Sequence, residues 1–276
     1  MKRTLALSAL ATMAASALAI DFENPPYNGS AGGTLLTGQD GWYQPVAGSV
    51  EWNVFTYAGN TMGVVANPGG GGAQFAGGIS AGATFARAQK DFAWDANTAY
   101  TMSYDVNHQY LGQLPTAQNL GSWSLQPSAT ARFFQDLHTW DDVSTAASWS
   151  LVFNAFDSTG LATNALSAGV EWTGLQVNHW YRMEHTFSFA TNQVLSTSIT
   201  DLHTNTTTSF APAGWYLAGG SAPTQPMPTA YRFFAGGAAG NAFAVDNSNI
   251  AVVPEPGTFI AIGAGIALLA LRRRRS

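Results

Sequence analysis

The sequence predicts an all-β fold, an antiparallel two-sheet jelly-roll sandwich with one apolar segment at each end. Residues 100–107 alternate apolar and polar side chains without interruption, and residues 181–189 do so over a longer run. A period of two is typical of a strand with one buried face. Joints rich in Gly and Pro separate such runs at 67–72, 77–82 and 219–228. Many short strands joined by turns favour a sandwich over a helical fold.

The first element is a predicted signal peptide at residues 1–19. Lys2 and Arg3 precede an apolar stretch, which closes with Ala17, Leu18 and Ala19. This order of charged, apolar and small residues is typical of a secretory signal peptide. We expect a helix that engages the Sec export machinery, followed by cleavage by signal peptidase after Ala19.

The second element is one β-sandwich domain at residues 20–252, because no break in composition divides this region. On the strand at 181–189, alternation places Arg182 and Glu184 on the polar face and His185 on the opposite face. The chain has no Cys, so its core must hold it without disulfides, and about 230 residues suffice for that. Further strands are expected at 149–153, 194–201 and 243–246, and near Trp52, Met62, Phe85, Phe133, Val170, Phe210 and Phe233.

Charge excludes one class of partner. Residues 20–253 contain five basic and fifteen acidic residues, a formal charge of −10. An acidic surface repels phosphate backbones, so we expect no nucleic-acid binding.

The third element is the C-terminal segment 253–276. Val253, Pro254, Glu255 and Pro256 open its motif at 253–257, in which the prolines enforce an extended backbone. An apolar helix is expected at 258–271, and its continuous apolar run extends from Phe259 to Leu271. A cluster of basic residues then forms the tail 272–275: Arg272, Arg273, Arg274 and Arg275.

This tail has the physical properties of a marginal membrane anchor. Arginines stay on the cytoplasmic side of a membrane. Thirteen apolar residues span about 20 Å as a helix, less than a hydrocarbon core of about 30 Å. The order of motif, apolar run and basic end resembles the PEP-CTERM sorting signal of Gram-negative bacteria. The resemblance implies cleavage at the Pro-Glu-Pro motif by an exosortase, transient inner-membrane anchoring, and final display at the cell surface or in the extracellular matrix.

The body carries a looser resemblance. Gly38-Gln39-Asp40-Gly41-Trp42 near the start, and Val245-Asp246-Asn247 with Ile250 near the end, resemble concanavalin A-like (laminin-G-like) jelly rolls. The resemblance implies that the first and last strands pair. It implies no activity, because this fold hosts lectins, enzymes and plain spacers.

Three tryptophans are candidates for binding a glycan. Trp42, Trp94 and Trp140 lie beside Gly or Asp residues typical of turns, and we expect them at the surface. Sugars stack on exposed aromatic rings, while amides and carboxylates bind their hydroxyl groups. Core positions are expected for three other tryptophans, Trp149, Trp172 and Trp180.

One acidic segment allows two interpretations. Asp136, Asp141 and Asp142 lie within seven residues, with His138 and Trp140 between them. The segment is either an exposed polar loop or a Ca²⁺ site, since Ca²⁺ prefers oxygen ligands. Apart from this candidate Ca²⁺, no cofactor is expected.

These features together predict an exported envelope or matrix protein with a structural or adhesive role rather than an enzyme. Two alternatives stay open. One is a carbohydrate-binding module, with exopolysaccharide as a candidate partner. The other is a polysaccharide-active hydrolase or lyase, which would need two converging carboxylates.

Overall fold

The computed structural model describes residues 18–70, 72–112, 117–126, 133–163, 172–222 and 225–253. The predicted helices at the two ends of the chain lie outside these residues, except that Leu18 and Ala19, at the end of the predicted signal peptide, form part of a strand. Within the described ranges, no helix is long and apolar enough to cross a membrane.

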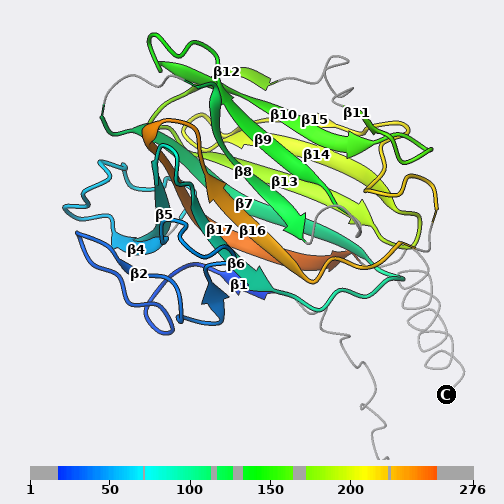
Figure 1. Ribbon diagram of the computed structural model, residues 1–276, viewed down its shortest axis with the longest axis horizontal. Coiled ribbons are helices and arrows are strands. Elements are labelled where there is room, and N and C mark those ends of the chain that lie inside the picture. The colour runs from blue at the N-terminus through cyan, green and yellow to red at the C-terminus, as the bar shows by residue number, and fades with distance from the viewer. Residues whose placement is uncertain are drawn as a thin grey trace, which may run out of the picture.

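Two antiparallel sheets packed face to face form the described chain (Figure 1), which confirms the predicted all-β sandwich. The first sheet has the order β15 (Thr206–Phe210), β14 (Gln193–Asp201), β13 (Tyr181–Ser188), β7 (Ala99–Tyr110), β17 (Ala239–Val253), β5 (Gln74–Ala81), β4 (Asn53–Thr56) and β2 (Thr34–Leu35). In addition, β1 (Leu18–Ile20) pairs with β17, with Leu18 opposite Ile250. The predicted pairing of the first and last strands is therefore confirmed.

The second sheet has the order β11 (Ala162–Thr163), β10 (Ser148–Phe156), β9 (Gln135–Trp140), β8 (Asn119–Gln126), β16 (Ala230–Ala235), β6 (Ala86–Asp91) and β3 (Trp42–Tyr43). A further strand, β12 (Trp172–Gln176), pairs with β10. The two long alternating runs of the sequence, at 100–107 and 181–189, correspond to β7 and β13, which are neighbours in the first sheet.

Two local expectations are wrong. Met62 lies in the segment between β4 and β5 rather than in a strand, and residues 77–81 belong to β5 rather than to a joint. The space that side chains at Gly77 and Gly78 would fill is occupied by the thioether of Met62 and the indole of Trp52. These glycines therefore serve close packing rather than a turn.

Aromatic side chains fill the space between the sheets. The rings of Trp42 and Trp52 both stack on Phe233, with centroid distances of 5.9 and 5.7 Å. Trp123 stacks in the same way on Phe187, at 6.0 Å. Each such side chain buries about 150–250 Å². Burial on this scale explains how a sandwich without disulfides is held together.

Candidate functional site

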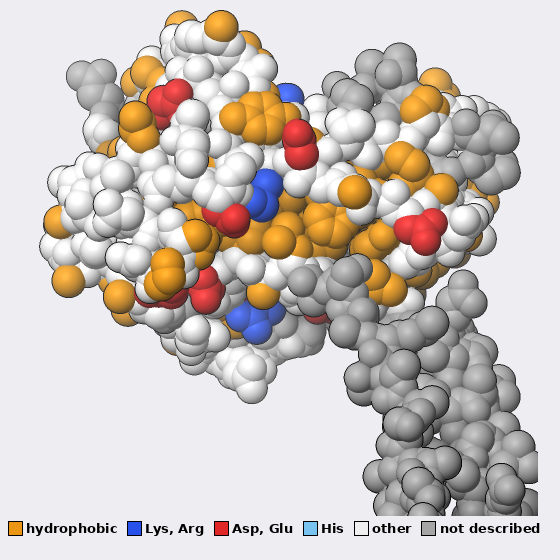
Figure 2. Space-filling model, turned by 90° about the horizontal axis from the view of Figure 1, so that it is seen from below, with side chains coloured by type: hydrophobic (Ala, Val, Ile, Leu, Met, Phe, Trp, Pro, Cys, Tyr) orange, Lys and Arg blue, Asp and Glu red, His pale blue; other side chains and the backbone are white. Residues whose placement is uncertain are grey.

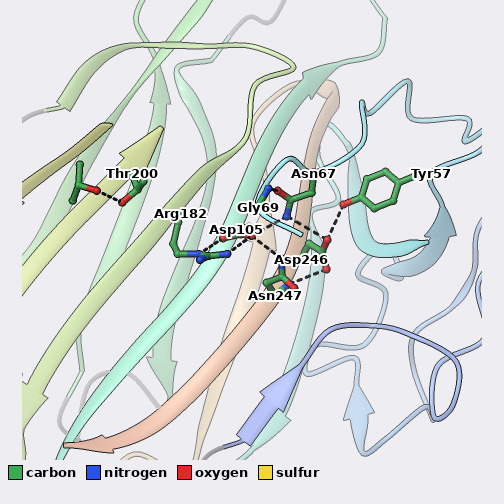
Figure 3. Close-up of polar contacts among 9 residues, drawn as sticks. Tyr57, Asn67, Gly69, Asp105, Arg182, Thr200, Asp246 and Asn247 are labelled. Carbon is green, nitrogen blue, oxygen red and sulfur yellow. Dashed lines mark hydrogen bonds and ion pairs between the residues drawn. The ribbon is translucent and has the colours of Figure 1, made fainter. Parts of the chain in front are cut away.

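Two carboxyl groups converge on the outward face of the first sheet. Asp105 on β7 lies directly opposite Asp246 on β17, and both are fully buried because residues 57–70 cover them. The Arg182 guanidinium donates two hydrogen bonds to Asp105, at 2.7 and 2.9 Å (Figure 3). Such two-point contacts fix both orientation and charge.

The covering segment is tied to the carboxyl groups by its own side chains. The Tyr57 hydroxyl donates to Asp246 at 2.8 Å. The Asn67 amide donates to Asp105 at 2.8 Å and to Asp246 at 3.3 Å (Figure 3). The Asn247 side-chain amide donates to Asp105 at 2.8 Å. We call the group of six residues formed in this way the carboxylate clasp: Tyr57, Asn67, Asp105, Arg182, Asp246 and Asn247.

The two carboxyl groups have different electrostatic environments. Burial raises the pKa of Asp246 to about 7, the neighbouring charge of Asp105 adds to the rise, and hydrogen bonds from Tyr57 and Asn67 oppose it. The hydrogen bonds and charge of Asp105 raise the pKa of Arg182. At neutral pH the clasp therefore holds an ion pair beside a carboxyl group that exchanges its proton.

A shallow cleft of about 270 Å³ borders the clasp. Arg182, Ser103, Asn247 and Asn249 contribute polar groups to its lining, and Ile20 closes one side. The carboxyl groups of Asp105 and Asp246 lie beneath this lining and do not reach the cleft. An outside molecule would meet the guanidinium and the amides first.

A second polar cluster, which we call the histidine network, lies between the sheets. Asp136 on β9 accepts hydrogen bonds from the Trp123 backbone N–H at 2.7 Å and, at Oδ2, from the Tyr104 hydroxyl. His185 Nε2 lies 2.8 Å from the same Oδ2. His138 Nε2 lies 3.6 Å from Asp136 Oδ1. His108 extends the network, because its Nε2 lies 2.7 Å from His138 Nδ1.

Burial and the contacts within the network together set the charges of its groups. Burial alone would raise the pKa of Asp136, but the hydrogen bonds and charges of His138 and His185 outweigh it and hold that pKa well below its usual range. Burial and the adjacent His138 lower the pKa of His108 well below its ordinary value. Asp136 is therefore ionised and His108 neutral at pH 7. Both are fully buried, so the network stabilises the contact between sheets.

The expected exposure of Trp42 and Trp140 is wrong. Each is 1% exposed. Trp42 lies in β3 and donates to the Tyr27 hydroxyl, whereas Trp140 ends β9 and donates to Asn241. Their neighbours in sequence are turn residues, but their side chains point between the sheets and present no face to a glycan.

The other predicted tryptophans follow expectation more closely. Trp149 and Trp180 are fully buried, and Trp172 is partly buried against the core. Trp94 is partly exposed and lines a cleft at the edge of the sandwich. Its role in glycan binding stays a prediction.

The proposed Ca²⁺ site of Asp136, Asp141 and Asp142 is wrong, and the alternative of an exposed loop holds for Asp141 and Asp142 but not for Asp136. Residues 135–140 form strand β9, in which Asp136 points into the core, while Asp141 and Asp142 are exposed after the strand ends. Five residues of strand separate Asp136 from Asp141 by about 17 Å. Among the described residues, no group of three or more acidic or histidine side chains is arranged to hold a metal ion.

The processing and anchor residues are described only at their inner borders. Ala19 lies in β1 opposite Asn249, and Val253 ends β17 opposite Ala99. The remaining predicted residues lie outside the described part of the chain: Ala17, Pro254, Glu255, Pro256, Phe259, Leu271, Arg272, Arg273, Arg274 and Arg275.

The C-terminal segment matches a known family model. Residues 252–275 match the PEP-CTERM protein-sorting motif. The motif indicates an exported protein that an exosortase sorts to the cell surface. No curated protein matches the chain.

Several solved structures resemble the body of the chain at low identity. A carbohydrate esterase from the Shiga toxin-encoding bacteriophage phi24B is 14% identical over 77% of this chain and 89% of its own, with a TM-score of 0.40. Lectin II from Ulex europaeus is 8% identical over 87% and 99%, with a TM-score of 0.40. Scytalido-glutamic peptidase is 12% identical over 64% and 73%, with a TM-score of 0.32. At these TM-scores the likenesses imply no shared activity or ligand.

Proposed function

We propose that this exported protein is a structural or adhesive component of the cell surface or extracellular matrix. One observation carries the proposal: the two carboxyl groups of the clasp and the titratable groups of the histidine network are fully buried and hydrogen-bonded to protein partners. The carboxylate clasp fastens residues 57–70 to the first sheet, and the histidine network connects the two sheets. Groups used in this way stabilise a scaffold and are not placed to meet a substrate.

The hydrolase or lyase alternative depends on the pair Asp105 and Asp246. The raised pKa of Asp246 beside Asp105, which contacts Arg182, is the kind of asymmetry that a general acid and its partner need. However, both carboxyl groups lie under residues 57–70 and accept hydrogen bonds from protein groups. The geometry therefore favours the structural role over catalysis.

The test compares three strains of the source bacterium. One produces the full chain, one lacks it, and one carries residues 253–276 on an unrelated exported sandwich. We expect cell attachment and matrix cohesion under shear to fall when the chain is absent, and to return with the full chain but not with the unrelated sandwich. Equal attachment in all three strains, with reducing sugar released from polysaccharide only when the full chain is present, would instead identify an enzyme.

A further inference from the structure

A second cleft lies at the edge of the sandwich, remote in sequence from the carboxylate clasp. Its volume is about 450 Å³, and it is lined by Asp91, Phe92, Ala93, Trp94, Pro228 and Thr229. After β6 the chain runs along the lower edge of the sandwich in Figure 1. That edge faces the viewer in Figure 2, where hydrophobic side chains form a band between polar surfaces. A cleft of this size falls within the range of about 300–1,000 Å³ that small-molecule sites occupy.

Two aromatic rings form the apolar wall of this cleft. The rings of Phe92 and Trp94 lie 4.5 Å apart and are partly exposed. Trp94 also makes edge contacts with Tyr100 at 5.2 Å and Phe189 at 5.5 Å. These contacts hold the indole in one orientation, so little conformational entropy is lost when a ligand packs on it.

Polar groups lie on both sides of the rings. Asp91 is exposed, and the Tyr43 hydroxyl orients its carboxylate by donating to Oδ1 at 2.8 Å. Thr229 is exposed on the other wall. The backbone N–H of Phe92 donates to the Thr229 carbonyl at 3.0 Å, which fixes the two walls relative to each other. The cleft thus places a carboxylate and a hydroxyl beside a rigid aromatic surface.

We propose that this cleft binds one neutral pyranose unit of a polysaccharide. A pyranose has an apolar face of C–H groups and a rim of hydroxyls, which match the rings and the flanking polar groups. The apolar face packs on Trp94 and Phe92, one hydroxyl donates to Asp91, and another bonds with Thr229. Asp91 and the formal charge of −10 over residues 20–253 disfavour uronic acids and sulfated sugars. The proposal rests on the adhesive role and names its ligand class.

The test uses the full chain, exported and sorted as in the source bacterium and then recovered from the cell surface. Its binding to immobilised neutral hexasaccharides of glucose, mannose and xylose is compared with its binding to polygalacturonate. The variants are Trp94→Phe, Trp94→Ala and Asp91→Asn. Trp172→Phe, at another partly buried indole, and Asp142→Asn, at another exposed carboxylate, are the matched controls.

We expect at least one neutral hexasaccharide to bind, with affinity falling about tenfold in Trp94→Ala and several-fold in Asp91→Asn. Trp94→Phe keeps an aromatic surface and core contacts, so it separates loss of stacking from loss of folding. Both controls should bind as the unchanged chain does. Binding by Trp94→Ala and Asp91→Asn as tight as that of the unchanged chain, preference for polygalacturonate, or no binding to any neutral hexasaccharide would overturn the proposal. Attachment under shear is measured independently of oligosaccharide binding. A negative binding result would therefore refute the proposed ligand class without refuting the adhesive role.

Discussion

Asp105 on β7 and Asp246 on β17 are direct cross-strand partners, and both side chains are fully buried. Like charges in such positions are destabilising. The guanidinium of Arg182 pairs with Asp105, and the raised pKa of Asp246 keeps that carboxyl group protonated to a higher pH. The hydrogen bonds of this pair involve the first sheet and residues 57–70. Variants of the pair should therefore change how tightly residues 57–70 are held to the first sheet.

Asp246→Asn should make the stability of the protein less sensitive to a rise in pH from acidic to neutral values. In the unfolded chain Asp246 ionises near pH 4, whereas in the fold its pKa is about 7. The folded state therefore holds more protons between these values, and stability is lost as the pH rises through that window. By linkage the loss is at most about 4 kcal/mol.

The measurement is the difference in free energy of unfolding between the two proteins at pH 5 and pH 8, from urea titrations. The neutral Asn should gain relative to Asp as the pH rises. Glu51→Gln, at a partly exposed acid that accepts a hydrogen bond from Thr37 rather than from a clasp residue, provides the control. A difference that is constant from pH 5 to pH 8 would contradict the assigned pKa.

Removing the guanidinium should destabilise the fold through the carboxylate that remains. Arg182→Ala leaves Asp105 buried without its cationic partner. Loss of one member of a buried pair costs about 3–5 kcal/mol. The side chain of Arg182 is 37% exposed, so we expect the lower end of that range.

Arg182→Lys should recover part of the loss, because it keeps the charge but not the two-point contact. Thermal unfolding at pH 7 measures both, and equal melting temperatures would refute a stabilising pair.

The histidine network should produce the opposite pH dependence. The pKa of His108 lies well below its ordinary value in the fold. The unfolded chain binds a proton there below about pH 6.5 while the folded chain does not. Stability is therefore present above that pH and lost as the pH falls. His108→Gln keeps a hydrogen-bonding group toward His138 but cannot become charged.

We expect the free energy of unfolding of this variant to fall less than that of the unchanged chain between pH 7 and pH 5. His203→Gln serves as the comparison: burial and the charge of His179 also lower the pKa of His203, but its side chain lies outside the core, so its effect should have the same sign and be smaller. A steeper fall in the His108 variant than in the unchanged chain would contradict a neutral buried histidine.

Alternation in single strands predicted the faces of residues but not what covers them. It placed Arg182 outward and His185 inward, and the structure agrees. It also placed Asp105 outward, where solvent would be expected, yet residues 57–70 close over it. Partnership between Asp105 and Asp246 requires the pairing of β7 with β17, which are more than a hundred residues apart. No local pattern encodes such a register.

The errors for Trp42 and Trp140 have the same physical origin. Turn residues beside a tryptophan indicate that the chain reverses nearby, but burial depends on which face of the short strand meets the other sheet. For Trp42 that strand has two residues, too few for alternation to reveal its face. For Trp140 the acids on either side suggested a loop, although Asp136 and His138 lie in β9 and face inward, where Asp136 contacts both His138 and His185.

Cleavage at the two ends should leave a mature chain that begins at Ile20 and lacks the four terminal arginines. Leu18 and Ala19 form part of β1, opposite Ile250 and Asn249 on β17. Cleavage after Ala19 removes these two residues, while Ile20, at 3% exposed, stays packed in the core. The amide among β17 residues 249 and 250 that faces β1 should therefore exchange hydrogen faster in the mature protein than in an uncut Ala17→Phe precursor, in which a bulky residue blocks cleavage. Intact mass spectrometry of the surface-released protein measures the ends, and hydrogen exchange measures β17. A mature mass that includes Leu18 would refute the cleavage site, and one that includes Arg272 would show that the tail is kept as an anchor.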